Sequence, residues 1–141
     1  MKSILSKRII NARVEHLYHA YSNPDILIQW WGPHGFSNRF NEFNFVENGL
    51  WDYHMIDENG KEYHNQSIFK TILPNSKIIA NHISAPLFEF EIDCIKITDK
   101  QTEVQFKMNF EDEVVYNALK DYVPEKNEEN FDRLETILNS L

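Results

Sequence analysis

The chain has 141 residues, of which 42% are hydrophobic, so it is long enough to fold as one domain around its own core. Its net charge is −8, and no cluster of Lys or Arg is longer than Lys7-Arg8, which argues against nucleic acid or an anionic membrane surface as a partner. Aromatic residues are abundant, with ten Phe, six Tyr and three Trp, and such rings suit strands and cavity walls.

The N-terminal residues and the single cysteine bear on the cellular location of the chain. The apolar start of the chain is interrupted by Ser6, Lys7 and Arg8, and no later apolar run reaches membrane length. We therefore expect no signal peptide, no membrane insertion and a cytoplasmic location. Cys94 lies among isoleucines, which predicts a buried and unreactive thiol.

The first 36 residues predict a strand followed by two short helices. Residues 4–12 are expected to form the strand, and apolar residues at helical spacing predict a helix over 14–21. Asn23 can cap a second helix that begins with Pro24. The segment 31–36, Trp-Gly-Pro-His-Gly-Phe, is rich in turn formers and predicts a loop.

Six more strands are expected in the middle of the chain, because apolar and polar residues alternate there. This alternation is typical of an antiparallel sheet with one dry face and one wet face. The sequence Asp57-Glu58-Asn59-Gly60 predicts a tight hairpin turn. The strands are expected over residues 38–46, 49–56, 61–72, 76–83, 87–97 and 102–110.

The C-terminal part predicts helix. Residues 113–122 are expected to form a short irregular helix, and an apolar stripe predicts a long helix over 126–140. Strands that are separated from helices along the chain indicate the α+β class. We expect one domain over 1–141, in which a curved antiparallel sheet wraps around the long C-terminal helix, with two short helices after the first strand.

Several motifs occur together in an order that is more specific than any one of them. They are Asn23-Pro24-Asp25, Gln29 to Phe36, Gly49 to Met55, Asp57 to Asn65, Phe69 to Ile72, and Asn130 to Leu134. In this order, over residues 6–141, the chain resembles the activator of heat-shock protein 90 ATPase homologue (AHSA) family, within the START-like or SRPBCC superfamily. The resemblance implies a helix-grip (START/Bet v-like) fold with a cavity between the sheet and the last helix, where relatives hold lipids, polyketides and plant hormones.

On this basis we expect the protein to bind a small hydrophobic molecule, lipid-like or aromatic, without a cofactor. A homodimer and a contact with a chaperone are further candidate partners. Candidate ligand-binding residues lie on the dry faces of the strands, in the double-Trp loop and on the last helix. They are Trp30, Trp31, Phe36, Trp51, Tyr53, Met55, Tyr63, Phe69, His82, Phe90, Phe106, Met108, Phe131 and Leu134.

Other interpretations stay open at this stage. Any one of these rings could fill the core rather than border a void. A cyclase- or hydrolase-like enzyme would need a Tyr, His or acid that faces the cavity, and a stress-related interaction domain would need an exposed apolar patch. Four acids alternate with apolar residues and are expected on the solvated face, so no catalytic residue is assigned: Asp52, Glu89, Glu91 and Asp93.

The histidines do not predict a metal site. His16 and His19 share a helix face, but only Glu15 is close to them as a further ligand. His54 and His64 flank the expected hairpin turn. With a loop of two or four residues they would point to opposite faces of the sheet, which argues against joint coordination.

Overall fold

The computed structural model describes residues 2–141, which form seven strands and four helices. The strands are β1 (Lys2–Ile10), β2 (Ser37–Phe43), β3 (Leu50–Ile56), β4 (Glu62–Leu73), β5 (Lys77–His82), β6 (Phe88–Thr98) and β7 (Gln101–Phe110). The helices are α1 (Val14–Ser22), α2 (Pro24–Trp30), α3 (Glu113–Leu119) and α4 (Val123–Ser140). The predicted α+β class and the predicted order of elements are confirmed.

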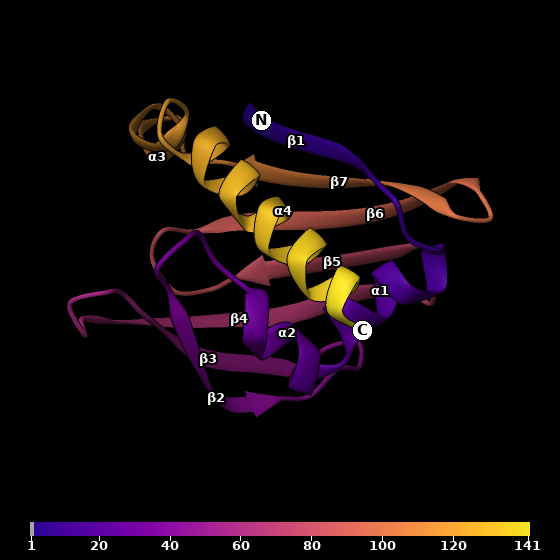
Figure 1. The fold of residues 1–141 in the computed structure, drawn as a ribbon. Coiled ribbons are helices and arrows are strands. Elements are labelled where there is room, and N and C mark those ends of the chain that lie inside the picture. Colours follow the sequence, from indigo (N-terminus) through magenta and orange to yellow (C-terminus); the bar gives the residue numbers. More distant parts are fainter. Residues whose placement is uncertain (1) are drawn as a thin grey trace.

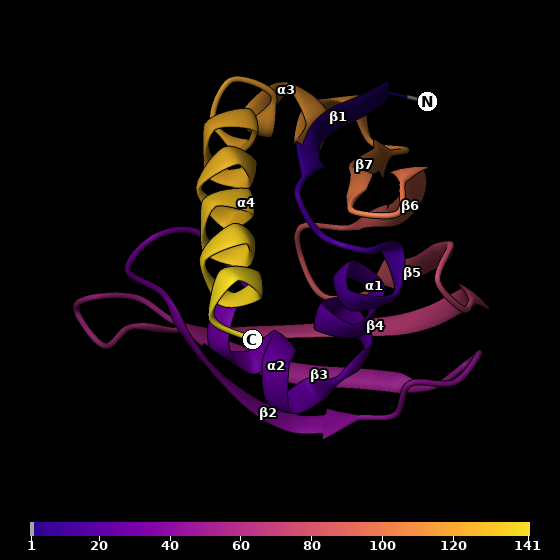
Figure 2. The same ribbon diagram turned by 45° about the vertical axis from the view of Figure 1, so that its right-hand side comes forward.

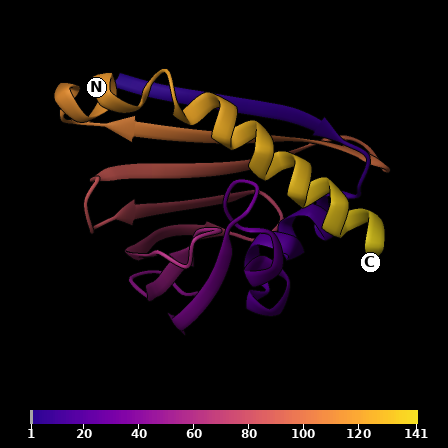
Figure 3. The same cartoon turned by 60° about the vertical axis from the view of Figure 1, so that its left-hand side comes forward.

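All seven strands form one antiparallel sheet in the order β1-β7-β6-β5-β4-β3-β2. Its strands bend around α4, which crosses one face of the sheet diagonally (Figures 1 and 2). Register shifts in β2, β4 and β6 add local bends. With the left-hand side of the molecule turned forward, α4 again lies over the sheet, and α1 and α2 lie near its C-terminal end (Figure 3). The predicted helix-grip arrangement is confirmed.

Helix α4 is fixed to the sheet by apolar and ionic contacts. Its Phe131 and Leu134 are buried, and full burial of such a side chain stabilises the fold by about 1.5–3 kcal/mol. Arg8 on β1 forms ion pairs with three acids of α4, at 2.9, 2.8 and 2.6 Å. These acids are Glu128, Asp132 and Glu135. No helix within residues 2–141 combines the length and the apolar character needed to cross a membrane.

The hairpin between β3 and β4 corrects one prediction. Ile56 pairs with Glu62, so the loop has five residues, 57–61, and His54 pairs with His64. The expectation that the two histidines lie on opposite faces is therefore wrong. That expectation assumed a loop with an even number of residues. When the loop is longer or shorter by one residue, every side chain of the second strand points to the other face of the sheet relative to the first strand.

Candidate ligand-binding site

A cavity of about 400 Å³ lies between the inner face of the sheet and the N-terminal half of α4. Its walls come from β3 to β7, the loop 31–36, the loop before β6 and the first turns of α4. This volume falls in the range of about 300–1,000 Å³ that is typical of small-molecule sites. Eight of the fourteen predicted residues line it: Trp31, Phe36, Tyr53, Met55, Tyr63, His82, Phe106 and Met108.

The other six predicted residues lie elsewhere. Trp51, Phe69 and Phe90 border a void of only about 10 Å³, too small for a ligand. Phe131 and Leu134 are buried in the core. Trp30 borders an outer groove between α2 and α4. Trp51, Phe69 and Phe90 lie outside the cavity because α1 and α2 cover their part of the inner face, where the rings pack against one another.

Several residues of the cavity wall do not follow from the apolar pattern of the strands. They include Gly32, Pro33, Asn65, Pro86, Tyr122, Val123, Lys126, Asn127 and Asn130. Phe88 also lines the cavity, but it does follow from the alternation in β6. Two of the α4 residues could have been predicted from their helical spacing. Asn127 and Asn130 stand at i and i+3 from each other and share a stripe with Phe131 and Leu134, so α4 turns all four toward the sheet.

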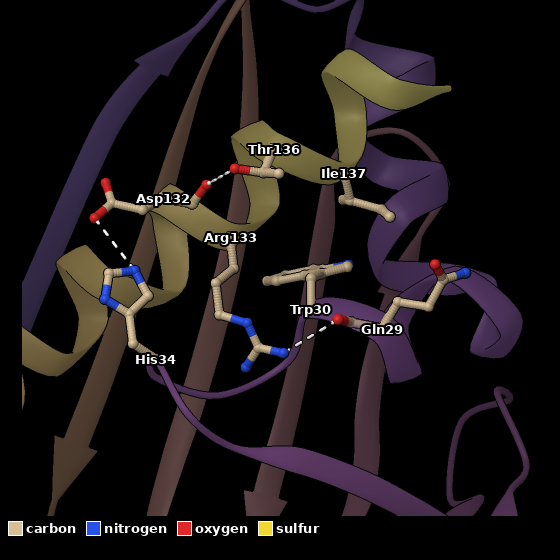
Figure 4. Close-up of a pocket in the computed structure, with 7 residues that line it drawn as sticks. All are labelled: Gln29, Trp30, His34, Asp132, Arg133, Thr136 and Ile137. Atoms are coloured by element: carbon tan, nitrogen blue, oxygen red, sulfur yellow. Dashed lines mark hydrogen bonds and ion pairs between the residues drawn. The ribbon is translucent and has the colours of Figure 1, made fainter. Parts of the chain in front are cut away.

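The loop over the cavity is held by Arg133 of α4. The guanidinium Nη1 donates to the backbone carbonyls of Trp31, Gly32 and Pro33 at 3.2, 3.0 and 3.0 Å. Its Nη2 donates to the carbonyl of Gln29 at 3.1 Å, and Figure 4 shows the side chain reaching from α4 toward this segment. The position of the cavity wall is thereby tied to the position of α4.

Gly32 gives this loop its shape. Its φ of +98° lies in the left-handed region, which side chains with a Cβ rarely adopt. A Cβ at this position would lie 2.7 Å from Cε of Met55, inside the cavity wall. The Gly32 N–H donates to Oδ1 of Asn130 at 3.0 Å, a second bond between loop and helix.

Tyr53 supplies a buried hydroxyl to the cavity wall. The indole Nε1 of Trp31 donates to its hydroxyl oxygen at 3.4 Å. Burial raises the pKa of Tyr53 well above its usual value, and the bond from Trp31 offsets only part of this effect, so the hydroxyl keeps its proton. Within residues 2–141 no hydrogen bond uses that proton, which leaves it available to a bound oxygen atom.

His82 is the second polar group of the wall. Its Nδ1 lies 2.7 Å from the carbonyl oxygen of Pro86, its Nε2 lies 2.8 Å from Oδ1 of Asn65, and its ring stacks on Phe88. Burial lowers the pKa of His82, and hydrogen bonds to the carbonyls of Pro86 and Ser84 offset only part of this shift. The shift favours the neutral form of the ring.

No carboxylate is found among the described residues that line the cavity. Glu89, Glu91 and Asp93 lie on the outer face, where Lys70 and Lys77 pair with them at 3.1–3.3 Å. The titratable groups of the wall are instead Tyr53, Tyr63, His82, Tyr122 and Lys126. A mainly apolar, open-sided space with a few polar groups can bury and orient part of an uncharged molecule.

The sequence matches a known family over most of its length. The family model described as "Activator of Hsp90 ATPase homolog 1-like protein" matches residues 11–139. A search by sequence among curated proteins returns no match.

Solved structures share the fold at low sequence identity. A protein of Arthrobacter aurescens has a TM-score of 0.90 at 17% identity, over 99% of this chain and 87% of its own. A protein of Rhodobacter sphaeroides has a TM-score of 0.88 at 16% identity, over 99% and 93% of the two chains. An AHSA1-like protein of Aeromonas hydrophila has a TM-score of 0.78 at 13% identity, over 99% and 93%.

Proposed function

This chain belongs to the activator of Hsp90 ATPase homolog 1-like family, and on that premise we propose that it binds a small apolar molecule in the cavity under α4. The observation that carries the proposal is the cavity itself. It has about 400 Å³ of space beside a tyrosine hydroxyl whose proton no described residue accepts. A fully packed interior would have left no such space.

Burial of apolar surface would supply most of the affinity. A ligand that buries about 200 Å² of apolar area gains about 5 kcal/mol at about 25 cal/mol per Å². The loss of translational and rotational freedom offsets part of this gain. Two structural features reduce the further cost of ordering the site, because Arg133 already fixes the loop and the sheet fixes the opposite wall.

The polar groups indicate which molecules fit best. Tyr53 can donate one hydrogen bond to a carbonyl or hydroxyl oxygen, whereas the rings of Trp31 and Phe106 contact an apolar body. At the cavity wall, the Lys126 ammonium lies 5.4 Å from the centre of the Tyr122 ring and is paired with Glu129. We therefore propose an aromatic or lipid-like molecule with a single oxygen acceptor.

A fluorescent probe tests this proposal. The neutral probe N-phenyl-1-naphthylamine should show a saturable rise in emission with the wild-type protein. Met55→Trp adds a ring inside the cavity wall and should weaken binding about tenfold or more. Leu73→Trp adds the same ring at a side chain that is 48% exposed and serves as the matched control.

The outcomes of this titration are distinct. Unchanged binding by a folded Met55→Trp protein would contradict the proposal, as would the lack of any saturable signal with the wild type. Thermal unfolding of each variant shows whether a loss of binding comes from a loss of fold.

A further inference from the structure

A cluster of potential metal ligands lies on the outer face of the sheet, opposite the cavity. His54 and His64 are direct cross-strand partners, and their rings stack with centroids 4.5 Å apart and planes 9° from parallel. Asp52 precedes His54 by two residues and therefore shares its face. Its Oδ1 lies 2.7 Å from Nε2 of His64. One ligand atom from each of the three residues lies within 4.8 Å of the other two.

Two amide side chains hold this cluster in place. A bulge in β2 between Phe40 and Glu42 contains Asn41, whose Nδ2 lies 3.0 Å from Oδ1 of Asp52 and 3.1 Å from Nδ1 of His54. Gln66 on β4 donates from Nε2 to Oδ2 of Asp52 at 2.9 Å. Bulges often aim a side chain at a functional site, and metal ligands are typically fixed by such outer hydrogen bonds.

The carboxylate of the cluster is charged over the whole physiological range. Hydrogen bonds from Asn41 and Gln66, followed by that from His64, lower the pKa of Asp52 to about 2. Arg39 on β2, the cross-strand partner of His54, pairs with Glu62 on β4 at 2.6 Å. Asp52 therefore keeps its negative charge next to two imidazoles.

We propose that Asp52, His54 and His64 bind one divalent transition-metal ion of the Zn²⁺ class on the outer face of β3 and β4. Two imidazoles and one carboxylate are a common protein ligand set for such an ion, and the fourth position would be open to water or to an exogenous ligand. The site is separate from the cavity and independent of the function proposed for it.

Metal binding requires a local rearrangement that can be observed. Tetrahedral Zn²⁺ with ligand distances of about 2.1 Å holds its ligand atoms about 3.4 Å apart. The in-plane lone pairs of two stacked rings point in parallel, so one ring must turn before both can reach a single ion. The hydrogen bond between His64 and Asp52 must open at the same time. All three side chains are on the surface of the sheet and can make these changes without disturbing the core.

The register of the hairpin removes the reason for expecting no metal site at His54 and His64. That expectation depended on His54 and His64 facing opposite sides of the sheet, whereas they are partners on one face.

A zinc titration of the full chain, prepared without a histidine tag, tests the proposal. At pH 7.5, competition between the protein and a chromophoric chelator should show one Zn²⁺ per chain. His54→Gln and His64→Gln should each weaken binding about a hundredfold, because each removes one of three ligands. His16→Gln removes an exposed histidine of α1 and should leave binding unchanged.

Two further readouts separate a built site from weak surface binding. In ¹H NMR spectra, Zn²⁺ should shift the imidazole signals of His54 and His64 and leave that of His16 in place. Acidification should release the ion, because imidazole ligands must be neutral. Circular dichroism confirms that each variant is folded. The absence of a 1:1 complex with the wild type would overturn the proposal. Wild-type affinity in the folded His54→Gln and His64→Gln variants would overturn it as well.

Discussion

The indole Nε1 of Trp31 lies 3.4 Å from the hydroxyl oxygen of Tyr53, and this contact joins the loop after α2 to β3 at the wall of the cavity. The donor of the pair comes from the loop that Arg133 holds, whereas the acceptor comes from the rigid sheet. Tyr53 therefore lies where the loop and the sheet meet at the cavity wall.

The role of this hydroxyl is tested by Tyr53→Phe. The variant should fold normally but should bind oxygen-containing apolar ligands about two- to tenfold more weakly, the loss expected for one neutral hydrogen bond. Affinity can be measured by displacement of N-phenyl-1-naphthylamine. Tyr18→Phe is the control, because its buried hydroxyl has no partner among residues 2–141 and lies outside the cavity. Equal displacement by all three proteins would contradict the assigned role.

The shape of the loop is tested by Gly32→Ala. The new Cβ would face both an unfavourable φ of +98° and the Cε atom of Met55 at 2.7 Å. We expect a loss of stability of more than about 1 kcal/mol together with weaker probe binding. Gly60→Ala is the matched control, since it has a φ of +83° and open space around the new Cβ. Equal losses of stability in the two variants would show that the contact with Met55 has no effect.

His82 should give the protein a specific dependence on pH. Because burial lowers its pKa in the folded state, the unfolded chain binds more protons as the pH falls below about 6.5. The contribution of His82 to stability is therefore complete above that pH and declines as the pH falls toward the folded-state pKa. Urea unfolding at pH 7.5, 6.0 and 5.0 should show a smaller decline for His82→Gln than for the wild type. Parallel declines would contradict this assignment.

Cys94 should be unreactive in the native protein. Its side chain is buried, and burial raises the pKa of the thiol to about 12, so almost no thiolate exists at pH 8. Ellman's reagent should label the chain only after denaturation. Rapid labelling of the folded protein would show that the strand β6 opens locally, which this structure does not predict.

The order of elements could be predicted from the sequence because local patterns determine it. Val104, Phe106 and Met108 alternate with polar residues in β7, and all three lie on the inner face of the sheet. The long terminal helix followed in the same way from its apolar stripe, which contains Phe131 and Leu134.

The extent of the cavity could not be predicted, because it depends on contacts between distant elements. Trp51 and Tyr53 are two residues apart on one face of β3, yet only Tyr53 lines the cavity. Their different surroundings depend on how far α1 and α2 extend across the sheet. The metal-ligand cluster was missed for a similar reason, because the pairing of His54 with His64 depends on whether the hairpin loop has an even or odd number of residues.

The central claim, that the cavity beneath α4 holds an apolar ligand, is tested most directly by NMR mapping of bound N-phenyl-1-naphthylamine on ¹⁵N-labelled protein. We predict saturable shifts at the loop 31–36, the inner residues of β3, β4 and β7, and the first turns of α4. Shifts confined to the outer groove at Gln29 and Thr136, or no saturable shift at all, would contradict it.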